Sequence, residues 1–122
     1  MINAKQVRAL ALSLPEVREL PHFDRASFRV RGKIFATIAP DQQSGMLKLD
    51  LDAHEELLAA EPETFFSFGG FSRNGATGVR FARVKKQVFG ELLGEAWRNV
   101  APKKPGDASV RSRTKRRASR PG

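Results

Sequence analysis

The residues best placed to do chemistry are cations that alternate with apolar residues in the run Phe-Arg-Val-Arg-Gly-Lys-Ile-Phe. Arg29, Arg31 and Lys33 occupy every second position of this run, and Arg80 recurs in a later apolar stretch. Cations on a strand face or a hairpin tip can bind phosphates, and an exposed ring such as Phe35 can stack on a base. The alternative is a solvated outer face whose charges keep an edge strand from pairing with other chains.

The net charge of +9 is concentrated at the C-terminal end of the chain. From Lys103 onward there are eight basic residues and one acid, so this segment carries +7. Residues 1–102 hold 14 basic and 12 acidic residues and are nearly neutral. The high charge therefore describes the last twenty residues rather than the folded part.

We divide the chain into a domain at residues 1–102 and a basic tail at residues 103–122. Val110 is the only large apolar residue of the tail, so it cannot offset its ordering entropy by burial, and we expect it to be disordered. Its cations fit phosphate binding by counterion release, although a tail that only improves solubility is the alternative. The candidate phosphate contacts in the tail are Arg113, Lys115, Arg116 and Arg117.

Catalytic patterns are missing from the chain. There is no Cys, and His22 and His54 are the only histidines, without the spacing of a metal motif. Ser67 and Ser72 lie near glycines, but no Gly-x-Ser-x-Gly elbow is present. We therefore expect no catalytic residue, no metal, no cofactor and no enzymatic activity. An enzyme of unrecognised type is kept as a third hypothesis.

The elements that would position the cations follow from periodicity. Asn3 and Gln6 form a capping box that begins a first helix, and Pro15 ends it. Asp52 and Glu55 are expected to begin a second helix in the same way. The expected strands are 27–31, 34–38, 46–51, 64–68 and 78–82, and the last helix is 86–100. The order α-β-β-β-α-β-β-α with short turns predicts an α+β fold, in which a curved antiparallel sheet packs against helices.

The length of the first hairpin loop decides which side chains share a face. A three-residue loop, 31–33, places Phe28, Val30 and Ile34 together, with Arg29 and Phe35 on the opposite face. A two-residue loop would instead place Arg29 beside Ile34. We expect the three-residue loop because it gives one clean apolar face.

Several motifs resemble the MmcQ/YjbR family over roughly residues 1–104. They are Leu14-Pro15, Pro21-His22-Phe23, the run from Ser27 to Ala36, Gly75-Ala76-Thr77, Val79-Arg80-Phe81, Ala96-Trp97-Arg98 and Ala101-Pro102-Lys103. The resemblance implies a CyaY-like double-wing fold and a DNA-binding label, with Arg31 and Lys33 as contacts. It supplies no catalytic residues. Many members have a Trp near Gly78-Val79, where this chain has none.

The sequence thus predicts a non-enzymatic DNA-binding module, with regulation as one use, that binds through the first hairpin and the tail. The alternative is a domain that binds a protein or small ligand through a Phe-rich surface built from residues 65–71. We expect a cytoplasmic protein, because no signal peptide or membrane-spanning run is present. The sequence leaves the oligomeric state open, with a monomer as the favoured state.

Overall fold

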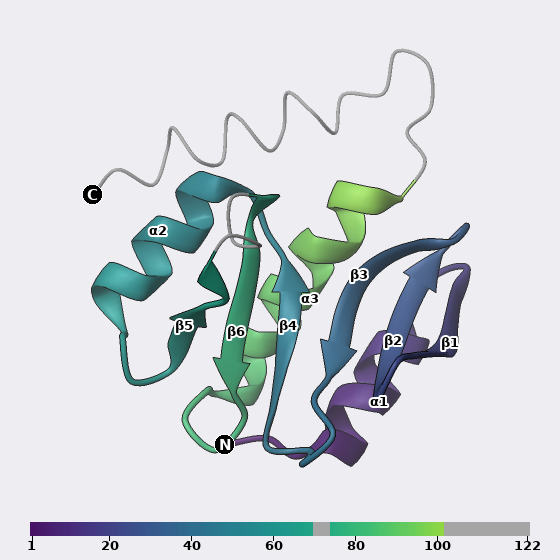
Figure 1. Cartoon of the computed structure of the whole chain (residues 1–122), viewed down its shortest axis with the longest axis horizontal. Helices are drawn as coiled ribbons and strands as arrows, with labels where there is room; N and C mark the ends of the chain where they lie inside the picture. Colours follow the sequence, from purple (N-terminus) through teal and green to yellow (C-terminus); the bar gives the residue numbers. More distant parts are fainter. Residues whose placement is uncertain (70–73, 102–122) are drawn as a thin grey trace.

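The computed structural model describes residues 1–69 and 74–101 of the chain, which form three helices and six strands (Figure 1). In chain order these are α1 Ala4–Leu12, β1 Val17–His22, β2 Arg25–Val30, β3 Lys33–Ile38, β4 Ser44–Lys48, α2 Leu51–Ala60, β5 Phe65–Ser67, β6 Ala76–Arg80 and α3 Lys86–Val100. The α+β fold class predicted from the sequence is confirmed.

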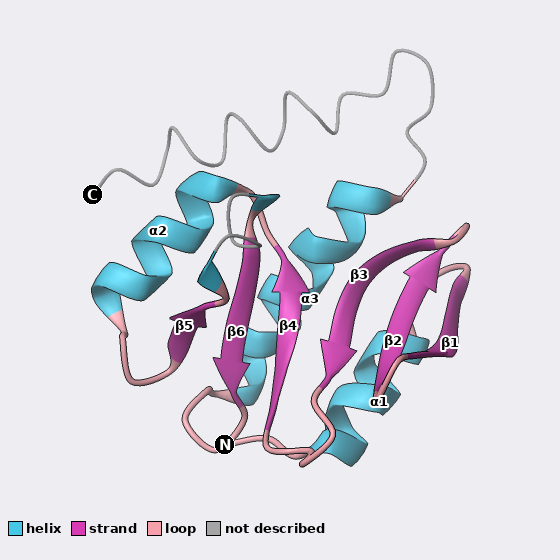
Figure 2. Ribbon diagram, in the orientation of Figure 1, coloured by secondary structure: helices cyan, strands magenta, loops and turns pink. Residues whose placement is uncertain are grey.

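The six strands form one antiparallel sheet in the order β1-β2-β3-β4-β6-β5. In Figure 2 the helices α1 and α3 lie behind this sheet, and α2 lies beside its β5 edge. His54 of α2 bonds to Thr77, whose cross-strand partner Leu47 belongs to the core, so α2 packs against the same face as the other helices. Within the described residues, the opposite face of the sheet has no helix over it, and we call it the open face.

Strand β1 is an addition to the predicted order. The sequence of Val17–His22 does not alternate, since a glutamate and a proline share a face with Val17 while Leu20 lies on the other. Its strand conformation follows from its hydrogen-bonded register with β2, from Val17 opposite Val30 to His22 opposite Arg25. This pairing is a tertiary property that local periodicity does not show.

The predicted three-residue loop between β2 and β3 is wrong. Residues Arg31 and Gly32 form a two-residue turn with φ values of 51° and 85°, as hairpins with primed turns require. Arg29 consequently lies opposite Ile34, which is only half-buried.

A register shift next to Phe28 restores most of the expected apolar face. On the side of this shift that is farther from the turn, Phe28 pairs with Ala36 and Ala26 pairs with Ile38. These are the pairs that the predicted three-residue loop would have produced. The extra residue is Phe35, which was expected on the face of Arg29 but is completely buried in the core. A bulge of this kind reverses the alternation for one residue, which explains why parity alone gave the wrong answer near the turn.

Two of the three described helices, α1 and α2, begin at a side chain that caps the helix, with one correction to the predicted position. The Asn3–Gln6 capping box is present in both directions. Helix α2 begins earlier than predicted, because the side chain of Asp50, rather than Asp52, accepts the Ala53 N–H at 2.8 Å. Helix α3 has the predicted bounds.

The core lies between the sheet and the helices and is rich in phenylalanine. Its largest completely enclosed side chains are Phe28, Phe35, Phe65 and Phe89. His54 is also buried. Its Nδ1 lies 2.9 Å from Thr77 Oγ1, whose hydroxyl donates to Gly75 O, so Nδ1 carries the proton of this bond.

None of the described helices combines the length and the apolar character that crossing a membrane requires. The predicted tail 103–122 falls outside the described residues, and so do residues 70 and 71 of the Phe-rich 65–71 segment.

Candidate nucleic-acid interface

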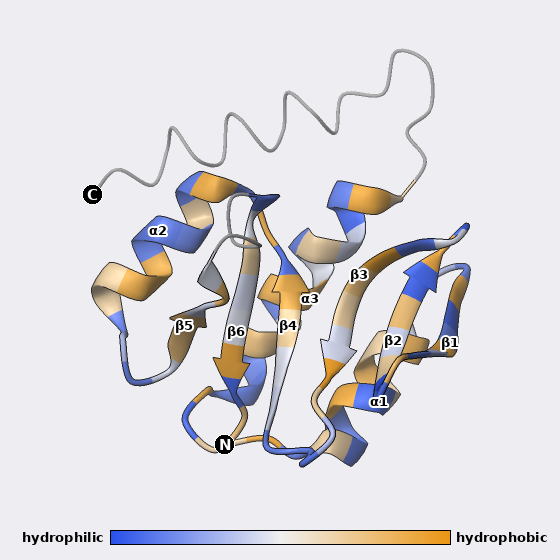
Figure 3. Ribbon diagram, viewed as in Figure 1, coloured by the Kyte–Doolittle hydropathy of each residue, from blue (hydrophilic) through white to orange (hydrophobic). Residues whose placement is uncertain are grey.

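The open face of the sheet carries cations without strand carboxylates to neutralise them. Glu19 is the only acidic residue in the six strands, and it lies on the helix-covered face, where it accepts from Arg8 of α1 at 2.9 Å. Apart from Arg25, which is paired with Asp24 at the hairpin turn, alternation places four basic side chains on the open face: Arg18, Arg29, Lys48 and Arg80. Figure 3 shows the hydrophilic character of β1 and of the end of β2.

Two of these arginines face each other directly across the ladder. Arg18 of β1 is the register partner of Arg29 of β2. Like charges in this position repel, typically by about 0.2–1 kcal/mol, unless a counter-charge lies between them. Within residues 1–69 and 74–101, neither arginine forms an ion pair with a carboxylate.

Neutral oxygens hold Arg29 in place. Its Nε donates to Ser27 Oγ at 3.0 Å, and one terminal nitrogen lies 3.4 Å from Pro21 O. Ser27 Oγ itself donates to Leu20 O at 2.7 Å. These bonds orient the half-buried guanidinium without cancelling its charge, so it remains able to attract an anion.

A cleft of about 490 Å³ opens over this pair. Its lining includes Arg18, Arg29 and Arg31, together with Leu20 and a single acid, Glu16. Glu16 is already paired, since its Oε1 accepts from Arg31 Nε at 3.1 Å. Two of the three guanidinium charges are therefore uncompensated within the cleft, which we call the arginine cleft.

The predicted cations of the first hairpin are brought together only in part. Arg29 and Arg31 both line the arginine cleft, but Arg31 is an exposed turn residue that forms an ion pair with Glu16. Lys33 is exposed at the start of β3 and is not part of the cleft lining. The predicted stacking residue Phe35 is not available, because it is enclosed in the core.

Arg80 lies on the open face but far from the cleft. Three strand spacings separate β2 from β6, which is about 14 Å, and Arg80 is at the opposite end of the strands. Its guanidinium carbon lies 4.6 Å from the centre of the Phe66 ring, and its Nη1 is 3.4 Å from Glu63 O. The Phe66 ring covers Gly78, where an added Cβ would lie 2.3 Å from it. This end of the face is thus an internally satisfied aromatic–cation stack.

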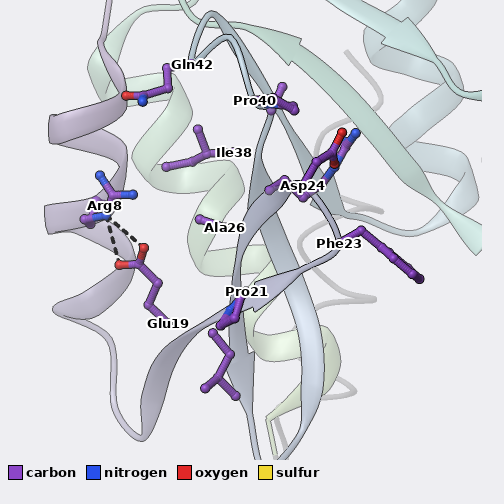
Figure 4. A pocket seen from close by; sticks show the side chains of 12 residues that line it. Arg8, Glu19, Pro21, Phe23, Asp24, Ala26, Ile38, Pro40 and Gln42 are labelled. Atoms are coloured by element: carbon purple, nitrogen blue, oxygen red, sulfur yellow. Dashed lines mark hydrogen bonds and ion pairs between the residues drawn. The ribbon is translucent and has the colours of Figure 1, made fainter.

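A second hollow, of about 580 Å³, lies beside α1 and the β1–β2 turn (Figure 4). Its charges are matched within the hollow, because Arg8 is bound by both oxygens of Glu19 and Arg25 lies 3.1 Å from Asp24. The hydrogen bond that Arg8 donates to Glu19 raises the pKa of Arg8 above its ordinary value. A hollow with paired charges offers an anion less than the smaller arginine cleft does, so we regard the cleft as the better candidate site.

Arg18 is the residue of the cleft that the sequence did not indicate. It lies in the Glu-Val-Arg-Glu-Leu stretch of residues 16–20, where two neighbouring acids suggest a locally balanced charge. The fold separates these charges, because Glu19 points to α1 and Glu16 to Arg31. The position of Arg18 opposite Arg29 can be recognised only once β1 is known to be a strand that pairs with β2.

The candidate contacts of the tail, Arg113, Lys115, Arg116 and Arg117, lie outside the described residues. Among the residues that are described, no three His, Asp or Glu side chains come together as a group that could hold a metal ion.

Comparisons with known proteins agree with this geometry at the level of the fold. A crystal structure of a Deinococcus radiodurans protein, described as carrying the domain DUF419, is similar with a TM-score of 0.76 and 21% sequence identity. The similarity covers 90% of this chain and 88% of the other. No match to a curated protein was found. The sequence model of the YjbR family matches residues 12–99, which hold the whole sheet, and the chain therefore belongs to the YjbR family.

Proposed function

We propose that this protein is a non-enzymatic nucleic-acid-binding module, with DNA as the expected ligand, and that the arginine cleft grips its phosphates. The observation that carries the proposal is the cross-strand pair of Arg18 and Arg29, two like charges opposed on an uncovered face with no carboxylate from the described residues between them. A phosphate placed between two guanidinium groups would replace their repulsion by two charge-assisted hydrogen-bond pairs.

The hydrogen bonds of Arg29 support a binding role over a purely structural one. A guanidinium that served only the fold would be expected to meet a carboxylate, as Arg8 and Arg31 do. Arg29 is instead aimed by neutral acceptors, a serine hydroxyl and a backbone carbonyl. This arrangement pre-orders the side chain and leaves the cationic charge for a ligand.

The basic tail is the second part of the proposal. It carries +7 of the total +9, so most of the non-specific, salt-sensitive affinity is expected to come from residues 103–122. The cleft would add phosphate contacts of fixed geometry. Removal of the tail should therefore reduce the salt slope and leave the contribution of the cleft intact.

The test is the salt dependence of binding by the double variant Arg18→Ala/Arg29→Ala. Two lost phosphate contacts should reduce the slope of log K against log salt by about 1.8 for duplex DNA or about 1.4 for a single strand. If the wild-type and variant proteins bind equally at about 1 M salt, the single-strand value corresponds to roughly 25-fold weaker binding of the variant at about 0.1 M salt.

The matched control is Lys5→Ala/Lys86→Ala, which removes the same charge from exposed positions on α1 and α3. Its slope should change little, because these lysines are on the helix side of the sheet. An equal loss of slope in both double variants would show that only net charge matters and would overturn the cleft as a site. The cleft would also be overturned as a site if Arg18→Ala/Arg29→Ala left binding unchanged in a protein that lacks residues 103–122.

A Phe-rich docking surface, the alternative from the sequence, finds less support in the geometry. Phe65 is enclosed in the core, and Phe66 is stacked between Gly78 and Arg80 on the other side of the sheet. Neighbouring members of the run thus point to opposite faces, and we propose no second function.

A further inference from the structure

The tip of the β1–β2 hairpin presents an aromatic ring to solvent. Strand β1 ends at His22 and β2 begins at its partner Arg25, so Phe23 and Asp24 form the turn. Phe23 is 93% exposed, more than any other large hydrophobic residue that the structure describes. Phe23 lies at the rim of the hollow beside α1 and belongs to its lining, and Figure 4 shows its ring extending away from α1.

Folding does not explain a phenylalanine at this position. Its φ is 59°, in the left-handed region that glycine and asparagine adopt far more readily than residues with bulky side chains. The exposed ring also gains almost no burial in return. Its one described ring contact is with His22, whose plane is inclined at 64° with 4.7 Å between ring centroids. An unfavourable backbone that carries an uncovered aromatic ring points to a role in binding.

We infer that Phe23 is a stacking platform for an unpaired base, so that the nucleic acid bound by this domain is single-stranded. This inference rests on the proposed function. An exposed aromatic face stacks on any base, and proteins that bind single strands combine such rings with a cationic track along the backbone. Both components are present on the β1–β2 hairpin.

The spacing on the hairpin suits one continuous strand of nucleic acid. Arg29 in the arginine cleft lies four residues along β2 from Arg25, next to the tip, which is a distance of about 13 Å. A strand that keeps the stacked rise of about 3.4 Å per nucleotide covers this distance with about four nucleotides, and a more extended single strand covers it with fewer. A single strand can therefore place phosphates at Arg18 and Arg29 while one of its bases stacks on Phe23.

The width of the open face argues against reading a duplex. Six strands at about 4.8 Å spacing make the sheet about 24 Å wide, whereas the major groove of DNA is about 12 Å wide and admits a helix or a two-stranded ribbon. The open face as a whole cannot enter that groove, and only the β1–β2 hairpin, itself a two-stranded ribbon, is narrow enough to do so. A flexible single strand has no such restriction, since its bases can be splayed over a sheet.

The experiment compares full-length wild-type protein with Phe23→Ala, using a labelled single-stranded oligothymidylate and a duplex of the same length. Wild-type protein should prefer the single strand. Loss of one stacked base should weaken single-strand binding by about 5- to 150-fold, the range that base–aromatic stacking energies give, with the salt slope unchanged. Phe23→Trp should restore binding, because tryptophan offers a larger ring.

Two controls separate stacking from folding and from general hydrophobicity. Phe23→Asn suits the left-handed backbone, so it should keep or raise the thermal midpoint and still lose single-strand affinity. Leu12→Ala truncates an exposed apolar residue at the end of α1, on the helix side, and should change neither property.

Each outcome decides between the two proposals. Wild-type affinity in Phe23→Ala would overturn the stacking role, while the proposed function would survive if Arg18→Ala/Arg29→Ala still reduced the salt slope. An equal loss on the single strand and the duplex would assign Phe23 to a wedge between paired bases and overturn the single-strand assignment. No binding of either nucleic acid by the wild-type protein would remove the proposed function itself.

Discussion

Two glycines with the same backbone angle should respond very differently to alanine. Gly32 in the β2–β3 turn and Gly75 before β6 both have φ of 85°. A Cβ added at Gly32 would meet nothing within 4 Å, whereas one added at Gly75 would lie 1.5 Å from Leu49 O. The pair therefore separates the cost of a left-handed backbone from the cost of a steric clash.

The magnitude for Gly32→Ala comes from the backbone alone. A left-handed L residue costs about 1–2 kcal/mol, and the less flexible unfolded chain returns about 0.4–1 kcal/mol. The net loss in the free energy of unfolding should be about 1 kcal/mol. The fold and the arginine cleft next to this turn should persist.

Gly75→Ala adds a clash to the same backbone cost. An ordinary contact between carbon and oxygen is about 3.3 Å, so the new methyl carbon and Leu49 O would have to separate by nearly 2 Å from a distance of 1.5 Å.

That movement disrupts the bond from Leu49 N–H to Gly75 O at 2.9 Å and the bond from Thr77 Oγ1 to the same oxygen. Each buried polar group left without a partner costs about 1–3 kcal/mol, so the total loss should reach about 3–6 kcal/mol. This is a large share of the stability of an ordinary small domain.

Urea unfolding measures both variants, with the fluorescence of Trp97, the only tryptophan, and far-ultraviolet circular dichroism as probes. For a slope of about 2 kcal/mol per molar urea, Gly75→Ala should unfold at least about 1 M below Gly32→Ala or show no cooperative transition. Midpoints within about 0.3 M of each other would mean that Gly75 and the end of β4 are not in close approach, and the reasoning would fail.

Two further substitutions test the packing on either face of the sheet. Thr77→Val leaves Nδ1 of the buried His54 without its 2.9 Å partner, so the free energy of unfolding should fall by about 1–3 kcal/mol; a loss below about 0.5 kcal/mol in urea titration would argue against the bond. Gly78→Ala places a methyl group 2.3 Å from the Phe66 ring and should displace that ring from the open face together with Arg80. Proton chemical shifts of the Arg80 side chain should then lose the ring-current displacement that stacking produces, and unchanged shifts would count against the stack.

The local sequence was sufficient to predict those elements whose structure depends on contacts between residues close together in the chain. The capping box at Asn3 and the apolar stripe of α3 are set by contacts within three or four residues, and both appear where they were predicted. The strands from β2 to β6 were also found, because alternation or turn residues mark them. The antiparallel pairing of β2 with β3 and of β3 with β4 followed from their short connections, whereas the pairing of β6 with β4, across α2 and β5, did not.

Long-range contacts decided the features on which the candidate site depends. Strand β1 has no alternation of its own and becomes a strand only by pairing with β2. The register shift beside Phe28 places Phe35 in the core rather than in the expected stacking position. Counting the residues of the loop assumes regular alternation along both strands, so it could not predict this shift.

The charge pattern shows the same division between sequence and fold. Composition established that the domain is nearly neutral and that the excess charge lies in the tail, because charges can be counted without knowing where they point. Only the tertiary structure separated the signs, by turning Glu19 toward Arg8 and leaving Arg18 opposite Arg29 on the open face. The physical reason is that adjacent strand residues point to opposite faces, so neighbours that cancel in the sequence can act on different sides of the sheet.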